Sequence, residues 1–307
     1  DRSHADIGMI DYVEEGYETA MAQVKKLTRV KKINVVGYCI AGTTLALTRA
    51  RRAKRGDTDD INCATFFTTL TDFSDQGEVG VFLNNDFLNG IEEECARTGV
   101  LGAIYMARTF SFLRSNALIY GPAIKSYMLG EAPPAFDLLY WNGDSTNLPG
   151  KMAVEYLRGL CQDDLFANGG FELGDETLYL QEVNVPLCAI ACETDHIAAW
   201  KASYNGIQKM SSPEKTFILS ESGHIAGIVN PPAKKKYGHY TNPDLAKAAD
   251  PWREGADFHE GSWWPRWDEW LKSRSEGKVK ARKPGGTKHD SLEKAPGTYV
   301  KVHAPHL

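Results

Sequence analysis

The stretch INVVGYCIAGTT, residues 33–44, places one cysteine where a strand would pass into a helix. The apolar run INVV is typical of a buried strand, and TTLALTRARRAKR after it has the apolar spacing of a helix. Gly37 and Ala41 are the small residues two positions before and after Cys39, and Gly42 follows directly. This spacing fits a nucleophile elbow, a sharp strand-to-helix turn that lifts a reactive side chain above the edge of a sheet.

The elbow would place Cys39 beside a helix N-terminus, whose partial positive charge favours a thiolate over a thiol. The remaining cysteines lack the close spacing of a disulfide framework or a zinc site, and we expect them to be reduced. Two of them, Cys188 and Cys192, are four residues apart in a strand pattern, so we expect both to be buried on one face. Cys39 is therefore the candidate nucleophile.

The composition of the 307 residues, 42% of them hydrophobic, is that of a globular protein with a sizeable core. The net charge of −5 argues against nucleic acid as a partner. No apolar run approaches the roughly 18 residues needed to cross a bilayer, and the N-terminus lacks a signal-peptide pattern. We therefore expect a cytoplasmic protein without a transmembrane segment.

Helical and strand patterns alternate through residues 1–71 and again through 185–272, which predicts an α/β core with a mostly parallel sheet. Residues 72–184 between these parts are interpreted as an inserted, mainly helical cap. The aromatic stretch HEGSWWPRWDEWLKS predicts a closing helix pinned by tryptophans, and residues 273–307 are interpreted as a linker and tail. The expected strands are KINVVGY, CATFFTTL, VPLCAIACE and KTFILS.

A nucleophile elbow requires an acid and a histidine later in the chain, in that order, on loops that follow strands. Asp195 follows VPLCAIACE, and His224 lies in SESGHIAG after KTFILS. The spacing between them suffices for one helix and one strand, so both can emerge at the same sheet edge as Cys39. His196, beside Asp195, is interpreted as a loop residue that orients the acid or faces the pocket.

Several motifs resemble those of polyhydroxyalkanoate synthases, the polymerases of bacterial storage polyester, and the likeness runs nearly the whole length of the chain. The motifs are GYCIAGTT, FFTTLTDFSDQG, TFSFLRSNALI, FDLLYWNGDSTNLP, ETDHIAAW, SGHIAGIVNPPAKKKYGHY and GSWWPRWDEWL, and the ending APGTYVKVHA is similar to that of the short-chain, single-subunit class. The resemblance implies an α/β-hydrolase-like fold, with Cys39 as the nucleophile that carries the chain, His224 as the general base and Asp195 as the third member of a triad.

By this resemblance the chain is an acyltransferase that polymerises 3-hydroxyacyl-CoA with release of CoA, without a cofactor or metal. Attack of a thiolate on a thioester gives another thioester, so the acyl group stays activated for transfer to a hydroxyl. His224 would deprotonate Cys39 for loading and a 3-hydroxyl group for elongation, while Asp195 either orients His224 or assists the hydroxyl. The backbone N–H of Ile40 is expected to be one oxyanion donor.

The family works as a dimer on granules, which implies a homodimer, a growing polyester chain and the granule surface as partners. The family usually has glycine where Ala41 stands, so we expect a methyl group at the tightest point of the turn. The resemblance covers roughly the second half of a synthase, and the N-terminal strands of the fold are expected to be missing. This predicts an exposed sheet edge, poor solubility and little or no polymerase activity of the 307 residues alone.

Two other functions stay open at this point. A hydrolase with a cysteine nucleophile, acting on esters or thioesters as a depolymerase does, needs the same triad, because the triad does not choose between water and a polymer hydroxyl. A catalytically silent truncated fragment would only dimerise or sit on granules.

Overall fold

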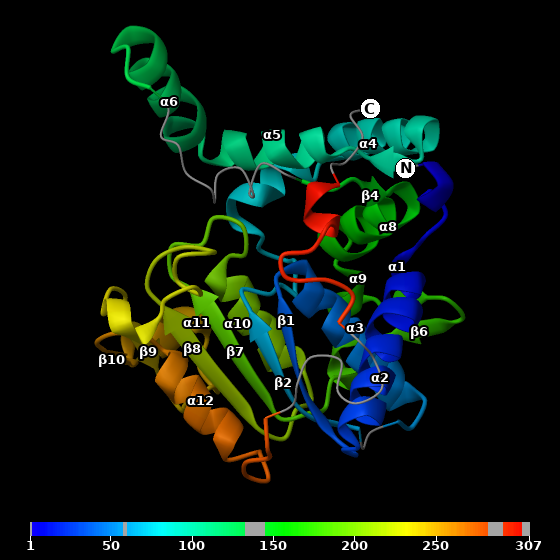
Figure 1. Ribbon diagram of the computed structural model, residues 1–307, viewed down its shortest axis with the longest axis vertical. Helices are drawn as coiled ribbons and strands as arrows, with labels where there is room; N and C mark the ends of the chain where they lie inside the picture. The colour runs from blue at the N-terminus through cyan, green and yellow to red at the C-terminus, as the bar shows by residue number, and fades with distance from the viewer. Residues whose placement is uncertain (1, 58–59, 133–144, 282–290, 303–307) are drawn as a thin grey trace.

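A computed structural model describes residues 2–57, 60–132, 145–281 and 291–302. A six-stranded sheet in the order β1-β2-β7-β8-β9-β10 lies at its centre (Figure 1). The first four strands pair in parallel and the last two are antiparallel, which confirms the predicted mostly parallel sheet. The strands are β1 (Ile33–Tyr38), β2 (Ile61–Phe67), β7 (Leu187–Cys192), β8 (Lys215–Ser220), β9 (His239–Thr241) and β10 (Asp257–His259).

The four expected strands form, with two corrections. The run CATFFTTL leaves the sheet after Phe67, because Thr68 has a φ of 40° that turns the chain. The first strand, β1, lies at the edge of the sheet and is not buried on both faces: Val36 is 48% exposed. Strands β9 and β10 were not predicted, because each has only three residues and lacks an apolar run.

Helices cover both faces of the sheet. Helices α3 (Ile40–Lys54) and α10 (Trp200–Lys209) pack on one face, and α12 (Trp264–Lys272) packs on the other. Strand β7 alternates between the two faces, so Cys188 and Cys192 both lie in the core beneath α12, as predicted. The indole N–H of Trp267 donates to the Thr65 hydroxyl at 3.0 Å, which confirms a closing helix held by tryptophan.

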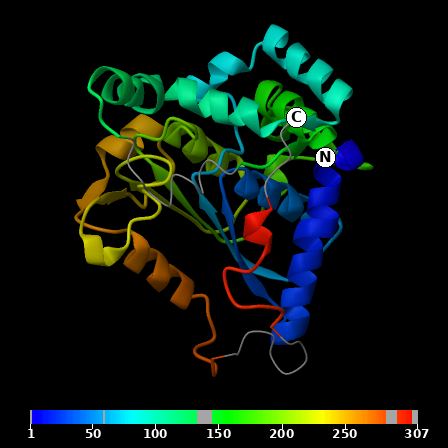
Figure 2. The ribbon, with the colours of Figure 1, turned by 45° about the horizontal axis from the view of Figure 1, so that its top comes forward.

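A helical segment opens the chain, continuous from Met9 to Thr28, and packs against α3 (Figure 2). The apolar residues of DYVEEGYETAMAQVKKL recur at helical spacing, which accounts for this helix. The segment consists of η1 (Arg2–His4), α1 (Met9–Asp11), the π-helix η2 (Tyr12–Glu18) and α2 (Thr19–Thr28).

The chain between β2 and β7 is mainly helical. Its helices between residues 85 and 128 lie over one end of the sheet (Figures 1 and 2), whereas residues 176–182 pack on α3. It also contains two small antiparallel sheets that were not predicted, β3 with β4 and β5 with β6. Its elements are η3 (Gly77–Phe82), α4 (Asn85–Thr98), β3 (Val100–Leu101), α5 (Ala103–Leu113), η4 (Asn116–Tyr120), α6 (Gly121–Ala123), η5 (Ile124–Met128), β4 (Leu148–Pro149), α8 (Gly150–Val154), η6 (Glu155–Gln162), α9 (Leu165–Asn168), β5 (Phe171–Leu173), β6 (Glu176–Leu178) and η7 (Leu180–Glu182).

Short elements complete the described part of the chain: η8 (Pro232–Lys234), α11 (Ala249–Glu254) and η9 (Tyr299–Lys301). Parts of the motifs FDLLYWNGDSTNLP and APGTYVKVHA, residues 136–144 and 303–304, lie outside the described residues. Within the described ranges, each helix is either too short or too polar to cross a membrane.

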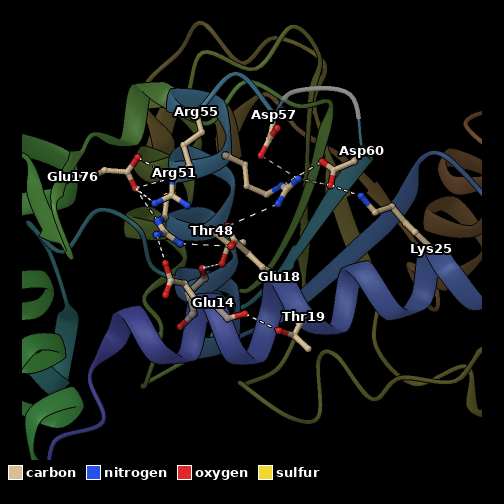
Figure 3. Close-up of polar contacts among 12 residues, drawn as sticks. Glu14, Glu18, Thr19, Lys25, Thr48, Arg51, Arg55, Asp57, Asp60 and Glu176 are labelled. Atoms are coloured by element: carbon tan, nitrogen blue, oxygen red, sulfur yellow. Dashed lines mark hydrogen bonds and ion pairs between the residues drawn. The ribbon is translucent and has the colours of Figure 1, made fainter.

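A buried arginine ties three segments together on the outer side of α3 (Figure 3). Arg51 is only 2% exposed and pairs with Glu14 and Glu18 of the N-terminal helical segment. Its Nε also donates to Glu176 of β6 at 2.8 Å. Because a buried charge is stable only when it is paired, these contacts fix the N-terminal helix and the β5–β6 hairpin on α3.

We predict that Arg51→Met destabilises the fold by about 3 kcal/mol, because it keeps the apolar stem but leaves three carboxylates without their shared partner. Urea unfolding followed by circular dichroism measures this loss. The matched control is Arg97→Met, since Arg97 pairs with Glu94 on an exposed helix surface and should contribute almost nothing. Equal effects of the two substitutions would contradict the prediction.

Candidate active site

Cys39 lies in a sharp turn between β1 and α3, where it is the N-cap residue. Its φ of 54° and ψ of −127° are unusual for a residue with a side chain, and such a conformation costs on the order of 1–3 kcal/mol. Hydrogen bonds hold the turn: the N–H of Cys39 donates to the Phe67 carbonyl at 2.9 Å, and the Cys39 carbonyl accepts from Gly42 at 2.9 Å. Strain retained at a single cysteine points to a functional position.

The turn is tightest at Gly37 and Gly42, not at Ala41 as expected. A Cβ atom on Gly37 would lie 2.5 Å from the Gly42 Cα, and one on Gly42 would lie 1.9 Å from the Thr69 Oγ1. Both positions therefore require glycine. Ala41 is half-buried, and its carbonyl accepts a hydrogen bond from the Tyr17 hydroxyl at 2.8 Å. The methyl group of Ala41 therefore does not lie at the close backbone contact between Gly37 and Gly42.

Ile40 is the first residue of α3, so its N–H belongs to the turn of the helix whose amides have no acceptor within the helix. Ile40 is 37% exposed. This places the expected oxyanion donor directly beside Cys39, on the accessible side of the turn.

Asp195 and His224 come from the loops after β7 and β8, and they are hydrogen-bonded to each other. The His224 Nδ1 lies 2.7 Å from the Asp195 Oδ2. The other carboxylate oxygen of Asp195 accepts from the backbone N–H groups of Ile197 and Ala198 at 2.8 and 2.9 Å. The Asp195 side chain is fully buried, so these donors fix its orientation.

Cys39 lies close enough to the His224 ring to contribute to the raised pKa of that ring. Because Nδ1 is held by Asp195, the opposite ring nitrogen, Nε2, is the one that remains for Cys39. The structure thus brings Cys39, His224 and Asp195 together at the carboxyl ends of three parallel strands.

The loop that carries His224 is fastened to the aromatic stretch at its back. The indole N–H of Trp263 donates to the Gly227 carbonyl at 2.8 Å, and that of Trp264 donates to the Ile228 carbonyl at 2.8 Å. From the sheet side, the Tyr38 hydroxyl donates to the His224 carbonyl at 2.6 Å. These contacts preorganise the histidine for a reaction at Cys39.

The charge state of His224 is set by opposing effects. Burial disfavours the charged imidazolium, but the hydrogen bonds and negative charges of Asp195 and Cys39 outweigh this and raise the pKa of His224 from 6.5 to about 9. At neutral pH His224 is therefore protonated beside Cys39.

The other five cysteines are unsuited to this chemistry. All are buried, whereas Cys39 is only partly buried. Burial raises the pKa of the Cys63 and Cys95 thiols to about 11 and that of Cys161 to about 12. The pKa values of Cys188 and Cys192 are raised further by the same cause. These thiols stay protonated and unreactive at neutral pH.

His196 lies between the Asp195 loop and the segments over the sheet. Burial, and then the charge of Arg114, lower its pKa below the ordinary 6.5. Its Nδ1 is buried, and no described residue hydrogen-bonds to it. His196 lies within electrostatic reach of Asp195 and His224.

Two residues of the π-helix η6, Tyr156 and Cys161, also lie within electrostatic reach of Cys39. Sequence reasoning missed both, because EYLRGLC has no motif and lies far from the elbow along the chain.

Comparison with known proteins gives relatives along almost the whole chain. It is 38% identical over 304 residues to a poly(3-hydroxyalkanoate) polymerase subunit of Rhizobium meliloti, covering 99% of this chain and 49% of that protein. It is 39% identical over 305 residues to a poly(3-hydroxyalkanoate) polymerase of Methylorubrum extorquens, covering 99% of this chain and 50% of that protein. The chain thus spans about half the length of these curated relatives.

Among solved structures, a monoacylglycerol lipase of Paleococcus ferrophilus matches with a TM-score of 0.38 and 15% identity, covering 69% of this chain and 66% of that chain. Residues 2–231 match the model of the family described as "alpha/beta hydrolase fold", well over half of the sequence. The chain therefore belongs to the alpha/beta hydrolase fold family.

Proposed function

We propose that the chain is the catalytic part of a polyhydroxyalkanoate synthase, an acyltransferase that forms polyester from 3-hydroxyacyl-CoA through a thioester on Cys39. The observation that carries the proposal is a partly buried thiol in a strained elbow, close to a hydrogen-bonded His224–Asp195 pair. The polymerase names of the relatives that match 99% of the chain support the substrate class.

In the loading step, the Cys39 thiolate attacks the thioester carbonyl of the acyl-CoA. A bond forms between Sγ and the carbonyl carbon, the bond from carbon to the CoA sulfur breaks, and His224 gives its proton to the departing CoA thiolate. The Ile40 N–H stabilises the oxyanion during the attack. Asp195, held by two backbone amides, keeps the histidine ring in place.

Acylation of Cys39 prepares the second step. The negative charge of Cys39 contributes to the raised pKa of His224, and this charge disappears when the sulfur carries an acyl group. The neutral imidazole is then able to take the proton of a 3-hydroxyl group, whose oxygen attacks the acyl carbon. The carbon–sulfur bond breaks, and the thiolate returns beside a protonated His224.

The rival enzyme, a hydrolase, would use water in place of the 3-hydroxyl group. The burial of His224, 8% exposed, does not separate the two reactions, so the polymerase names of the relatives carry the choice of a 3-hydroxyl acceptor. A catalytically silent fragment would need neither a strained turn at Cys39 nor a histidine held in a fixed orientation.

Residues 72–184 are proposed to control access to Cys39, since their helices between residues 85 and 128 lie over the sheet end that carries it. A homodimer and attachment to polyester granules in the cytoplasm are proposed as well. Large exposed apolar surfaces commonly mark interaction sites, and the helices from α5 to η5 carry many such side chains. These are Ile104, Phe112, Leu118, Tyr120, Ile124, Tyr127 and Met128.

The deciding experiment incubates the 307-residue chain with 3-hydroxybutyryl-CoA and measures released CoA and a covalent adduct by intact mass spectrometry. We expect slow release of CoA with an adduct on Cys39, loss of both in Cys39→Ala, and retention of both in Cys95→Ala, a buried thiol in a separate hydrophobic cluster. Polymer as the product supports the synthase, and free 3-hydroxybutyrate would support the hydrolase. Absence of any adduct would favour the silent fragment.

The raised pKa of His224 predicts a pH-dependent contribution to stability. Because the folded value, about 9, exceeds the ordinary 6.5, protonation of His224 stabilises the fold fully below pH 6.5 and this contribution disappears as the pH rises through about 9. The difference in unfolding free energy between the wild type and His224→Gln should therefore shrink from pH 6.5 to pH values above 9. Urea unfolding at both pH values measures it, and a constant difference contradicts the prediction.

A further inference from the structure

A tyrosine of the N-terminal helical segment reaches the nucleophile elbow. The Tyr17 hydroxyl donates a hydrogen bond to the Ala41 carbonyl at 2.8 Å, two residues after Cys39. This carbonyl lies in the first turn of α3, and its second lone pair remains for the helical N–H of Leu45. Tyr17 therefore contacts the backbone of the elbow directly, yet it has no role in the steps proposed above.

Two peptide groups connect this contact to the expected oxyanion donor. The Ala41 carbonyl shares a planar peptide group with the Gly42 N–H, which donates to the Cys39 carbonyl at 2.9 Å. The Cys39 carbonyl in turn shares a planar group with the Ile40 N–H. The direction of the Ile40 N–H is therefore fixed by a chain of hydrogen bonds that begins at the Tyr17 hydroxyl. Hydrogen bonds in such a chain also polarise one another, which strengthens the donor at its end.

Ion pairs on both sides of Tyr17 hold its helix on α3 (Figure 3). Glu14 and Glu18 lie before and after it in the π-helix η2, and both pair with the buried Arg51 of α3. The Tyr17 ring is half-buried and packs against the main hydrophobic core. The phenol is thus fixed to the same helix whose first turn it contacts.

The Tyr17 phenol keeps its proton at neutral pH. Burial raises the pKa of Tyr17 above the ordinary 10, although the nearby Thr44 hydroxyl offsets part of this rise. The one proton of the phenol is therefore available for the Ala41 carbonyl throughout the neutral range.

We propose that Tyr17 is a positioning residue for the oxyanion donor, whose hydroxyl orients the Ile40 N–H for the attack of Cys39 on an acyl carbonyl. As Sγ bonds to the carbonyl carbon, the electron pair of the C=O bond moves to oxygen, where the Ile40 N–H stabilises it. The pair returns when the leaving group departs, and Tyr17 keeps its proton throughout. The inference rests on the proposed acyl transfer at Cys39.

The test compares two reactions of the Cys39 sulfur, of which only one passes through an oxyanion. Acylation by p-nitrophenyl butyrate or by 3-hydroxybutyryl-CoA requires the oxyanion, whereas alkylation by iodoacetamide is a direct displacement. Tyr17→Phe keeps the packed ring and removes the hydroxyl. We expect the acylation rate at saturating ester to fall by about 3–10-fold, the effect of one neutral hydrogen bond, with KM and the alkylation rate unchanged.

A second readout follows the acyl group itself. Acylation with a butyryl ester labelled with ¹³C at the carbonyl places that carbonyl on Cys39, and its infrared stretching frequency falls as the hydrogen bond to its oxygen becomes stronger. We expect this band at a higher frequency in Tyr17→Phe than in the wild type, because the Ile40 N–H is less well aligned. A change confined to the packing of the N-terminal helix would leave the band in place.

Tyr204→Phe is the matched control, because it removes another hydroxyl that donates to a backbone carbonyl, that of Lys247 just before α11, at 2.8 Å. It should change neither rate. Acylation of Tyr17→Phe at the wild-type rate, equal losses of acylation and alkylation, or an unchanged carbonyl band would overturn the inference. A wild type that is acylated by the aryl ester but not by the CoA ester contradicts the proposed function alone. Failure of both esters with the wild type overturns both.

Discussion

The close approach of Gly37 to Gly42 is the constraint on which the site depends. With no side chain on either residue, β1 can turn directly into α3, and Thr69 of the neighbouring strand's loop closes against the same point. Cys39 then has to adopt the strained conformation between them, and the free energy of this strain is offset by the packing of β1 and α3 in the core. Backbone contacts therefore fix the position of Cys39, and this position does not depend on the rotamers of neighbouring side chains.

The other members of the site follow from the parallel sheet. The carboxyl ends of the parallel strands β1, β7 and β8 point to the same edge of the sheet, so loops that are distant in sequence bring Cys39, Asp195 and His224 to that edge. The hydrogen bonds around Asp195 and the indole donors behind His224 then remove the freedom that loops normally keep. The same contacts with Asp195 and Cys39 outweigh the burial of His224 and raise its pKa to about 9.

Much of this arrangement could be predicted from the sequence. The β-branched runs and helical spacing gave the parallel strands, and the order of Cys39, Asp195 and His224 is that of an elbow enzyme. Local sequence patterns gave wrong or missing predictions where tertiary contacts determine the structure. Ala41 occupies the position at which the elbow motif has a small residue, but the close contact with Gly37 is made by Gly42, one residue later. Strands of three polar or aromatic residues, such as β9, form only because β8 offers an edge.

Tyr156 shows the same limit in a different form. Its electrostatic effect on the site depends on the winding of η6 and on the packing of its ring against Phe73, and neither leaves a periodic signal in the sequence. Side chains on one face of an α-helix are three or four positions apart. A search of the sequence for that spacing therefore does not pair Tyr156 with Cys161, which are five positions apart.

The tryptophans behind the His224 loop give the molecule a built-in optical probe. Four of its seven tryptophans lie in or next to α12, and two of them donate their indole N–H to the loop that carries the base. Indole emission depends on hydrogen bonding and on nearby charge, so binding, acylation or movement of this loop should be visible in the intrinsic fluorescence of the unlabelled chain. The same contacts that hold the histidine still would report when it moves.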